Sequence, residues 1–72
     1  MSIKLGKRIR GLRLLKGFTQ QELAEKIDIS VTMLSHIERG LKNPKPHLLE
    51  MIVTTLDIPP EELFLLPDGK AK

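Results

Sequence analysis

The sequence predicts a compact all-α domain of five helices, in which the second and third helices form a helix-turn-helix. Two helix start signals, Thr19 and Ser30, lie eleven residues apart. That spacing holds about two turns of helix and a tight turn, as in a helix-turn-helix. Apolar residues elsewhere recur at helical spacing, and no stretch alternates as a strand does. With 72 residues and no cysteine, we expect one small domain over residues 1–66, followed by a tail over residues 67–72.

The first helix is expected over residues 3–16. Leu5, Ile9 and Leu12 recur four and three residues apart, so they share one face and should point inward. The basic residues of this segment then lie on the outer face. Gly17 follows at a position where helices commonly end with a residue in the left-handed conformation.

The second and third helices have clear boundaries. The Thr19 hydroxyl is expected to accept a hydrogen bond from the amide of Glu22, and the Glu22 carboxylate to accept one from the amide of Thr19. Ser30 is the N-cap residue of the third helix, and Gly40 is its expected stop. The residues that should face inward from these two helices are Leu23, Ala24, Ile27, Leu34 and Ile37.

Two further helices are expected after a loop at residues 41–45. Pro46 fits the first position of a helix that runs to Leu56. Pro60 fits the first position of a short last helix that runs to about residue 66. The fourth helix offers the core Leu48, Leu49, Ile52, Val53 and Leu56.

Charge is distributed unevenly along the chain, although the formal net charge is only +3. Residues 1–20 carry six basic and no acidic side chains, residues 21–45 carry four of each, and residues 46–69 carry five acidic ones. Such a separation favours a polyanion at the basic end and leaves the other end free for a protein partner. A basic helix face that is simply solvated is the alternative.

Few reactive groups are placed to cooperate in chemistry, so we expect no enzyme, no cofactor and no metal site. His36 and Glu38 are two residues apart on a helix and point in different directions. His47 and Glu50 share one face, but no second pair completes a metal site. No secretory leader and no apolar run approaching ~18 residues is present, so we expect a cytoplasmic protein without a membrane span.

Several motifs follow one another in a particular order along the chain. They are Leu5-Gly6-Lys7-Arg8-Ile9-Arg10-Gly11-Leu12-Arg13, Thr19-Gln20-x-Glu22-Leu23-Ala24, Ser30-x-x-x-Leu34-Ser35-x-Ile37-Glu38-Arg39-Gly40, Asn43-Pro44 and Leu56-x-Ile58-Pro59-Pro60-Glu61-Glu62-Leu63. Together they resemble the DNA-binding domain of the lambda-repressor, Cro and Xre family of bacterial and phage regulators. The likeness spans residues 5 to about 66, and it implies a lambda-repressor-like fold that binds double-stranded DNA.

The resemblance implies two sets of DNA contacts. Base reading in the major groove falls to the recognition helix, at Val31, Thr32, Ser35 and His36. Phosphate contacts are expected from Gln20, Ser30, Arg39, Lys42, Asn43 and Lys45. Gln20 matches a family position that contacts a phosphate, whereas the others are chosen by place and chemistry, and Arg39 serves either phosphate or solvent. On periodicity alone, the polar stripe of this helix also fits any solvated helix.

Two positions bear on the fold itself. Arg13 and Glu38 match a pair that is salt-bridged inside the family fold, so the resemblance implies a structural ion pair. Asp28 is a departure, since the family usually has glycine at this point of the turn. The position requires a positive φ, which Asp tolerates better than most residues other than Gly.

A sequence-specific transcriptional regulator, most simply a repressor, is the function we expect. The first alternative is the antitoxin of a toxin–antitoxin pair, which would use the same DNA fold and bind a protein partner at its acidic or apolar C-terminal end. The second is a protein-interaction module that does not bind DNA. Binding to a specific duplex separates the first two functions from the third.

The last helix suggests how two copies would assemble. Leu63, Phe64, Leu65 and Leu66 form an apolar run, and we expect it to be a dimer interface. One short helix reads only a few base pairs, so two half-sites are needed to select a site in a genome. A two-fold homodimer, formed in solution or on DNA, then requires a palindromic operator with half-site centres about 34 Å apart.

Overall fold

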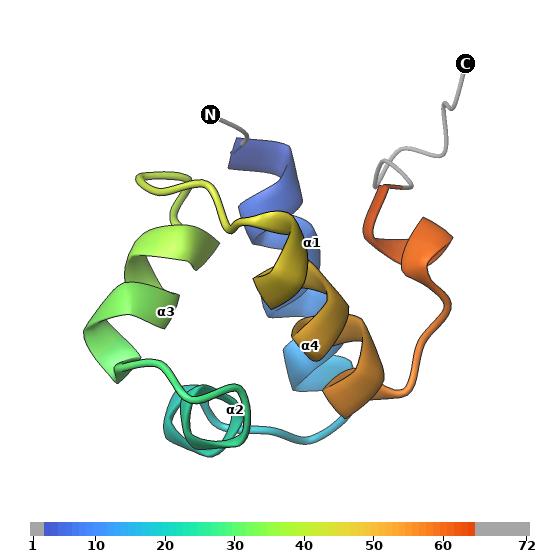
Figure 1. Ribbon diagram of the computed structural model, residues 1–72, viewed down its shortest axis with the longest axis horizontal. Coiled ribbons are helices and arrows are strands. Elements are labelled where there is room, and N and C mark those ends of the chain that lie inside the picture. The colour runs from blue at the N-terminus through green and yellow to red at the C-terminus, as the bar shows by residue number, and fades with distance from the viewer. Residues whose placement is uncertain (1–2, 65–72) are drawn as a thin grey trace.

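The structure is a computed structural model that describes the backbone of residues 3–64 and the side chains of residues 4–63. Its helices are α1 (Ile3–Leu15), α2 (Gln20–Lys26), α3 (Val31–Glu38) and α4 (Pro46–Leu56), followed by the 3₁₀ helix η1 (Pro60–Phe64). In Figure 1, α3 lies at one side of the molecule, η1 at the other, and α1 and α4 between them. The described residues contain no strand, as the sequence predicts.

The expected fifth α-helix is not confirmed, because the segment from Pro60 to Phe64 is a single stretch of 3₁₀ helix. The amide of Glu62 donates to the carbonyl of Pro59 at 3.0 Å, an i to i+3 bond. So few residues form too few hydrogen bonds to offset the cost of starting an α-helix, and the tighter 3₁₀ turn serves instead. Positions 65 and 66, which were expected to extend this helix, lie outside the described residues.

The ends of α2 and α3 have the expected capping geometry. Glu22 N donates to Thr19 Oγ1 at 3.0 Å, and Thr19 N donates to Glu22 Oε1 at 2.9 Å. Met33 N donates to Ser30 Oγ at 3.0 Å, which closes the first turn of α3. In the turn between these helices, Asp28 has φ 59°, the left-handed conformation that the sequence predicts for it.

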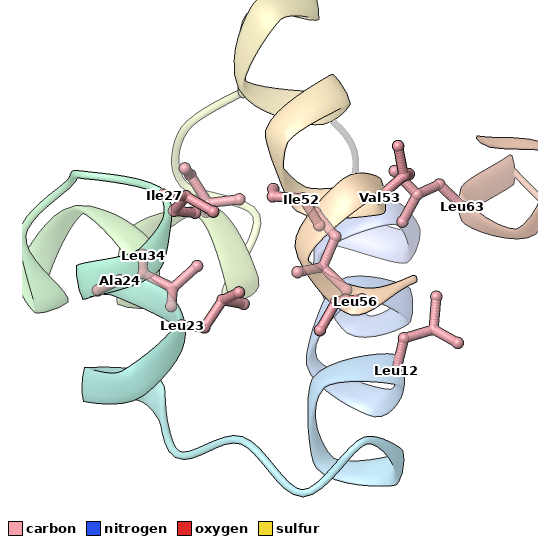
Figure 2. Packing of buried hydrophobic residues seen from close by; sticks show 11 residues of the cluster. Leu12, Leu23, Ala24, Ile27, Leu34, Ile52, Val53, Leu56 and Leu63 are labelled. Atoms are coloured by element: carbon pink, nitrogen blue, oxygen red, sulfur yellow. The ribbon is translucent and has the colours of Figure 1, made fainter. Parts of the chain in front are cut away.

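The core is formed by one cluster of buried side chains contributed by all five elements. In Figure 2 the side chains of α2 and α3 face those of α4, and Leu12 of α1 and Leu63 of η1 lie beyond α4 in this view. Its members are Ile9, Leu12, Leu23, Ala24, Ile27, Leu34, Ile37, Ile52, Val53, Leu56 and Leu63. Through Leu34 and Ile37, this packing holds α3 against the rest of the domain.

Two contacts that the sequence reasoning missed hold α1 in place. Gly6 is buried, and a Cβ atom built on it would lie 2.6 Å from the carbonyl oxygen of Glu38 and closer still to that of Ile37. At the other side of α1, Arg8 Nη2 lies 2.6 Å from Glu62 Oε1, and Arg8 Nε donates to the Glu62 carbonyl at 2.8 Å. The first contact brings α1 against the end of α3, and the second ties η1 to α1.

Leu63 belongs to this core rather than to the surface. Its side chain is 2% exposed and joins the buried cluster of its own chain. Leu63 is therefore not available as a surface side chain, so one of the four residues expected in the dimer interface is lost to it. The side chains of the other three, Phe64, Leu65 and Leu66, lie outside the described residues.

Candidate nucleic-acid interface

The outer face of α3 carries the four side chains that the resemblance assigns to base reading. Val31 and Thr32, in the first turn, are exposed, and Ser35 and His36, one turn later, are half-buried. A helix with its side chains is about 10–12 Å wide, which is narrow enough for the major groove of DNA, about 12 Å wide.

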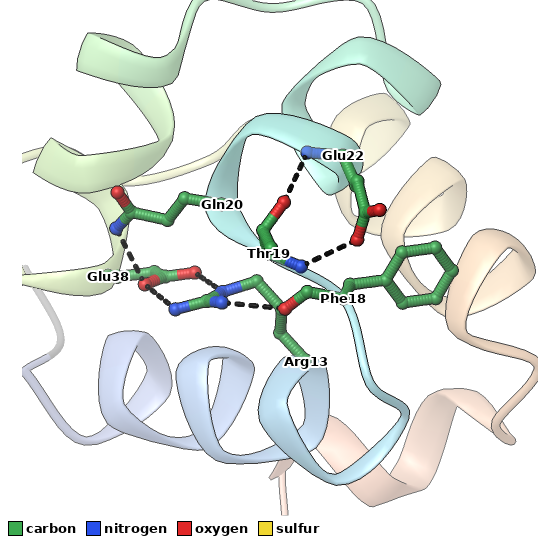
Figure 3. Close-up of polar contacts among 6 residues, drawn as sticks. All are labelled: Arg13, Phe18, Thr19, Gln20, Glu22 and Glu38. Carbon is green, nitrogen blue, oxygen red and sulfur yellow. Dashed lines mark hydrogen bonds and ion pairs between the residues drawn. The ribbon is translucent and has the colours of Figure 1, made fainter.

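One flank of α3, at its last residue Glu38, is closed to solvent by a buried polar network of Arg13, Gln20 and Glu38 (Figure 3). Arg13 Nε donates to Glu38 Oε2 at 2.7 Å, and Arg13 Nη2 donates to Glu38 Oε1 at 3.2 Å. Only 6% of the Arg13 side chain and 1% of the Glu38 side chain are exposed. Arg13 Nη1 also donates to the carbonyl of Phe18 at 2.8 Å. The structure thus brings together the two residues expected to pair, with α1 holding the end of α3.

Gln20 joins this network, which the sequence reasoning did not foresee. Its Nε2 donates to Glu38 Oε1 at 3.0 Å. An ionised carboxylate only accepts hydrogen bonds, so Glu38 requires the amide nitrogen of Gln20, rather than its oxygen, to face inward. The second N–H of that nitrogen and the amide oxygen are left for other partners. Gln20 is half-buried at the first position of α2, so its head group is held at the surface beside α3.

Further donors surround the exposed face of α3. The Ser30 hydroxyl accepts from Met33 N, so its own hydrogen remains available to donate. Arg39 lies at the C-terminal end of α3 and is exposed. The three candidates in the connection from α3 to α4, all exposed, are Lys42, Asn43 and Lys45. Polar donors therefore lie near both ends of the recognition helix.

The other flank of α3 is open. A groove of about 550 Å³ lies between the turn from α2 to α3, α3 itself and the beginning of α4. Ile27 and Ile37 are buried at its base, and Met33 and Met51 are half-buried in its walls. The sequence gives no signal for this groove, because its walls come from three segments that only the fold brings together.

The described residues include neither a membrane-spanning helix nor a cluster of metal ligands. None of their helices is long and apolar enough to cross a bilayer. Among the same residues, no three His, Asp or Glu side chains come together as metal ligands.

The sequence matches a family model described as helix-turn-helix over residues 9–63, more than half of the chain. The HTH-type transcriptional regulator YazB of Bacillus subtilis is 41% identical over 58 residues, which cover 81% of this chain and 84% of YazB. The transcriptional regulator SinR of the same species is 42% identical over 55 residues, which cover 75% of this chain and 50% of SinR. The chain thus spans about half the length of SinR.

Solved structures share the fold. The restriction-modification controller protein C.AhdI of Aeromonas hydrophila superimposes with a TM-score of 0.82 at 37% identity, covering 86% of this chain and 94% of that one. A structure of the biofilm regulator SinR in complex with DNA superimposes with a TM-score of 0.77 at 39% identity, covering 83% of this chain and 97% of that one. The arrangement of α2 and α3 therefore matches that of a chain crystallised on DNA.

Proposed function

The chain belongs to the helix-turn-helix family of the lambda-repressor, Cro and Xre type, and from this premise we propose that it regulates transcription by binding specific sites in double-stranded DNA, most simply as a repressor. The observation that carries the proposal is the exposed face of α3, which has polar donors near both ends of the helix. The family consists of transcription regulators, which supports a binding function rather than an enzymatic one. We expect the protein to act in the cytoplasm, on the nucleoid.

Base reading would begin with the first turn of α3. Val31, 41% exposed, and the methyl group of Thr32 suit the C5-methyl of thymine. The polar groups of Thr32, Ser35 and His36 suit donors and acceptors on base edges. None of these is an Arg, Asn or Gln, the residues that form the strongest bidentate base pairings. DNA shape and deformability would therefore supply part of the specificity.

Phosphate contacts would fix the register of α3 in the groove. Gln20 approaches from the N-terminus of α2, and its Nε2 keeps one N–H for a phosphate while it donates the other to Glu38. Ser30 adds a hydroxyl donor at the N-terminus of α3. On the other side, Lys42, Asn43 and Lys45 would hold the second backbone, joined by Arg39. Such contacts position the protein without reading sequence.

We further propose that two copies bind a palindromic operator. A recognition helix of eight residues contacts too few base pairs to select one site in a genome. A two-fold dimer places two such helices on two half-sites and so doubles the number of base pairs that are read. Residues 63–66 remain the proposed interface. Since Leu63 is buried in its own chain, contact between copies would rest on Phe64, Leu65 and Leu66. In the antitoxin alternative, the protein partner is expected at this C-terminal end, where Asp57 and Glu61 are exposed.

Selection of bound duplexes from random DNA, followed by footprinting at physiological salt, tests the proposal. The expected result is an enriched inverted repeat whose half-sites lie about one helical turn apart. Inserting five base pairs between the half-sites turns one of them to the opposite side of the duplex and should abolish cooperative binding. No enrichment over the input pool would refute sequence-specific binding. An enriched single half-site that tolerates the insertion would refute the dimer alone.

A further inference from the structure

The groove on the open flank of α3 has the size and lining of a binding site. Its volume of about 550 Å³ lies within the range of roughly 300–1,000 Å³ that is usual for ligand pockets. Ile27 and Ile37 form its base, and four half-buried apolar side chains form its walls. These wall residues are Ile29, Met33, Leu48 and Met51. An opening of this kind in so small a domain leaves apolar surface that the core does not use.

DNA does not account for this lining. A duplex presents phosphates and base edges to a protein, and its phosphates are bound by charged and polar groups. Methionine is a flexible, polarizable side chain that recurs on adaptable binding surfaces. Two of the three methionines of the chain line the groove. The lining therefore suits apolar side chains better than a nucleic acid.

The lips of the groove carry charge of opposite sign. Lys42 and Lys45, in the connection to α4, stand on one lip, with His47 beside them, and Asp28 stands on the other. Among the described residues, neither lysine forms an ion pair with a carboxylate. Two separate ammonium groups on one lip match two carboxylates along a peptide better than they match a single anionic head group.

We propose that this groove docks an acidic segment of a partner protein, which places apolar side chains between Met33 and Met51 and carboxylates against Lys42 and Lys45. A second copy of this chain does not supply such a segment from its described residues. Its nearest equivalent is η1, where Glu62 already pairs with Arg8 and Leu63 is buried. Among the described residues, then, a second copy offers no acidic segment with free apolar side chains that matches the groove.

Occupancy of the groove excludes DNA. Lys42 and Lys45 are proposed phosphate contacts, and the carboxylates of the partner would take the place of the phosphates. The partner would thus release the regulator from its operator. Exclusion rests on the proposed function, whereas docking itself does not, so the two are measured separately.

Docking is tested by selecting binders to the full 72-residue protein from a displayed library of random 12-residue peptides. The expected binders carry at least two carboxylates and two large apolar residues, and they shift the methyl resonances of Met33 and Met51. Met51→Glu should weaken their binding roughly tenfold or more, because it places a negative charge in the apolar contact and repels the carboxylates of the peptide. Thr54→Glu is the matched control, since Thr54 is exposed on the same helix outside the groove.

A charge reversal tests the basic lip in the same way. Lys45→Glu should weaken the selected peptides, whereas Lys26→Glu, at an exposed lysine outside the groove, should not. Circular dichroism confirms that each variant is folded. If the selection returns no acidic binders, or if Met51→Glu leaves their affinity unchanged while Thr54→Glu also does, the docking proposal is wrong.

Competition is then measured with the duplex obtained from the DNA selection. The duplex should displace a labelled peptide, and excess peptide should release the duplex. Simultaneous binding of both would refute exclusion and leave the docking site standing. A protein that docks the peptide and binds no DNA would instead refute the proposed function.

Discussion

On one flank of α3 a carboxylate is buried among donors, whereas on the other flank methionine and isoleucine side chains line a groove that is open to solvent. Glu38 accepts three hydrogen bonds, two from Arg13 and one from Gln20. Among the described residues, no buried side-chain nitrogen or oxygen lacks a partner. Met33 and Met51, by contrast, face a groove of about 550 Å³. A helix of eight residues is therefore hydrogen-bonded to buried groups on one side and left accessible on the other.

The difference follows from what each kind of burial requires. Removing two charges from water costs several kcal/mol per ion, and only good geometry with additional hydrogen bonds offsets that cost. The closed flank meets this condition, because Arg13 and Gln20 supply Glu38 with three hydrogen bonds. Apolar contacts have no directional requirement, so the open flank accepts side chains of various shapes. We infer that the closed flank sets the position of α3 and that the open flank serves a partner.

Breaking the closed flank should have the largest effect. Glu38→Gln leaves the buried Arg13 guanidinium without a counter-charge, so the free energy of unfolding should fall by roughly 3–5 kcal/mol. Urea denaturation without DNA measures this change. The matched control is Glu62→Gln, which removes the carboxylate from the more exposed pair with Arg8 and should cost about 1 kcal/mol or less. Equal losses in the two variants would show that burial of the Arg13 pair carries no special weight.

The close approach of α1 to the C-terminal end of α3 is tested at Gly6. A Cβ atom there would overlap the carbonyl oxygens at the end of α3, so Gly6→Ala should lower the free energy of unfolding by about 1–3 kcal/mol. Gly11→Ala is the control in the same helix, because nothing lies within 4 Å of a Cβ at that position. This control should stabilise the protein by roughly 0.5–1 kcal/mol. The two melting curves should therefore move in opposite directions, and a gain in stability from Gly6→Ala would contradict the close approach.

The exposed face between the two flanks is expected to carry specificity. Thr32→Ala and His36→Ala should each weaken the selected duplex by about 1–3 kcal/mol per lost base contact, with a smaller loss on random DNA. Fluorescence anisotropy against both duplexes at one salt concentration gives the ratio. Lys26→Ala, at an exposed residue of α2 away from the proposed contacts, is the control and should leave that ratio unchanged. A wild-type ratio in both alanine variants would mean that α3 is docked incorrectly.

The features that could be predicted from the sequence are those that depend on residues close together in the chain. The capping box of Thr19, the cap of Ser30 and the positive φ of Asp28 depend on residues one to three positions away, and the structure has all of them. The groove and the contact of Gly6 depend on segments that are distant in sequence. The sequence pattern does not indicate how closely such distant segments approach each other in the fold. The link of Arg8 to Glu62 was missed for the same reason.

The family resemblance predicts that Arg13 and Glu38 form a structural pair and that Gln20 contacts a phosphate, and it gives no link between the two. In the structure they form one network, which joins a proposed DNA contact to a buried charge. For DNA binding, the consequence is that the network fixes the orientation of the Gln20 side-chain amide. A Gln amide that hydrogen-bonds an ionised carboxylate cannot present its oxygen to it, so the remaining N–H is directed by Glu38.

The smallest effect is expected at that junction. Gln20→Ala removes one neutral hydrogen bond to a phosphate, so it should weaken the selected and the random duplex equally, by about 0.5–1.5 kcal/mol. Glu38→Asp keeps the charge but shortens the side chain, and it should weaken both duplexes through the misplaced Gln20 amide. If Glu38 acts on DNA through Gln20, adding Glu38→Asp to Gln20→Ala should cost no further affinity, although it still lowers the melting temperature. Double-mutant cycles on affinity and on stability separate the two roles, because a purely structural Glu38 would give additive losses of affinity.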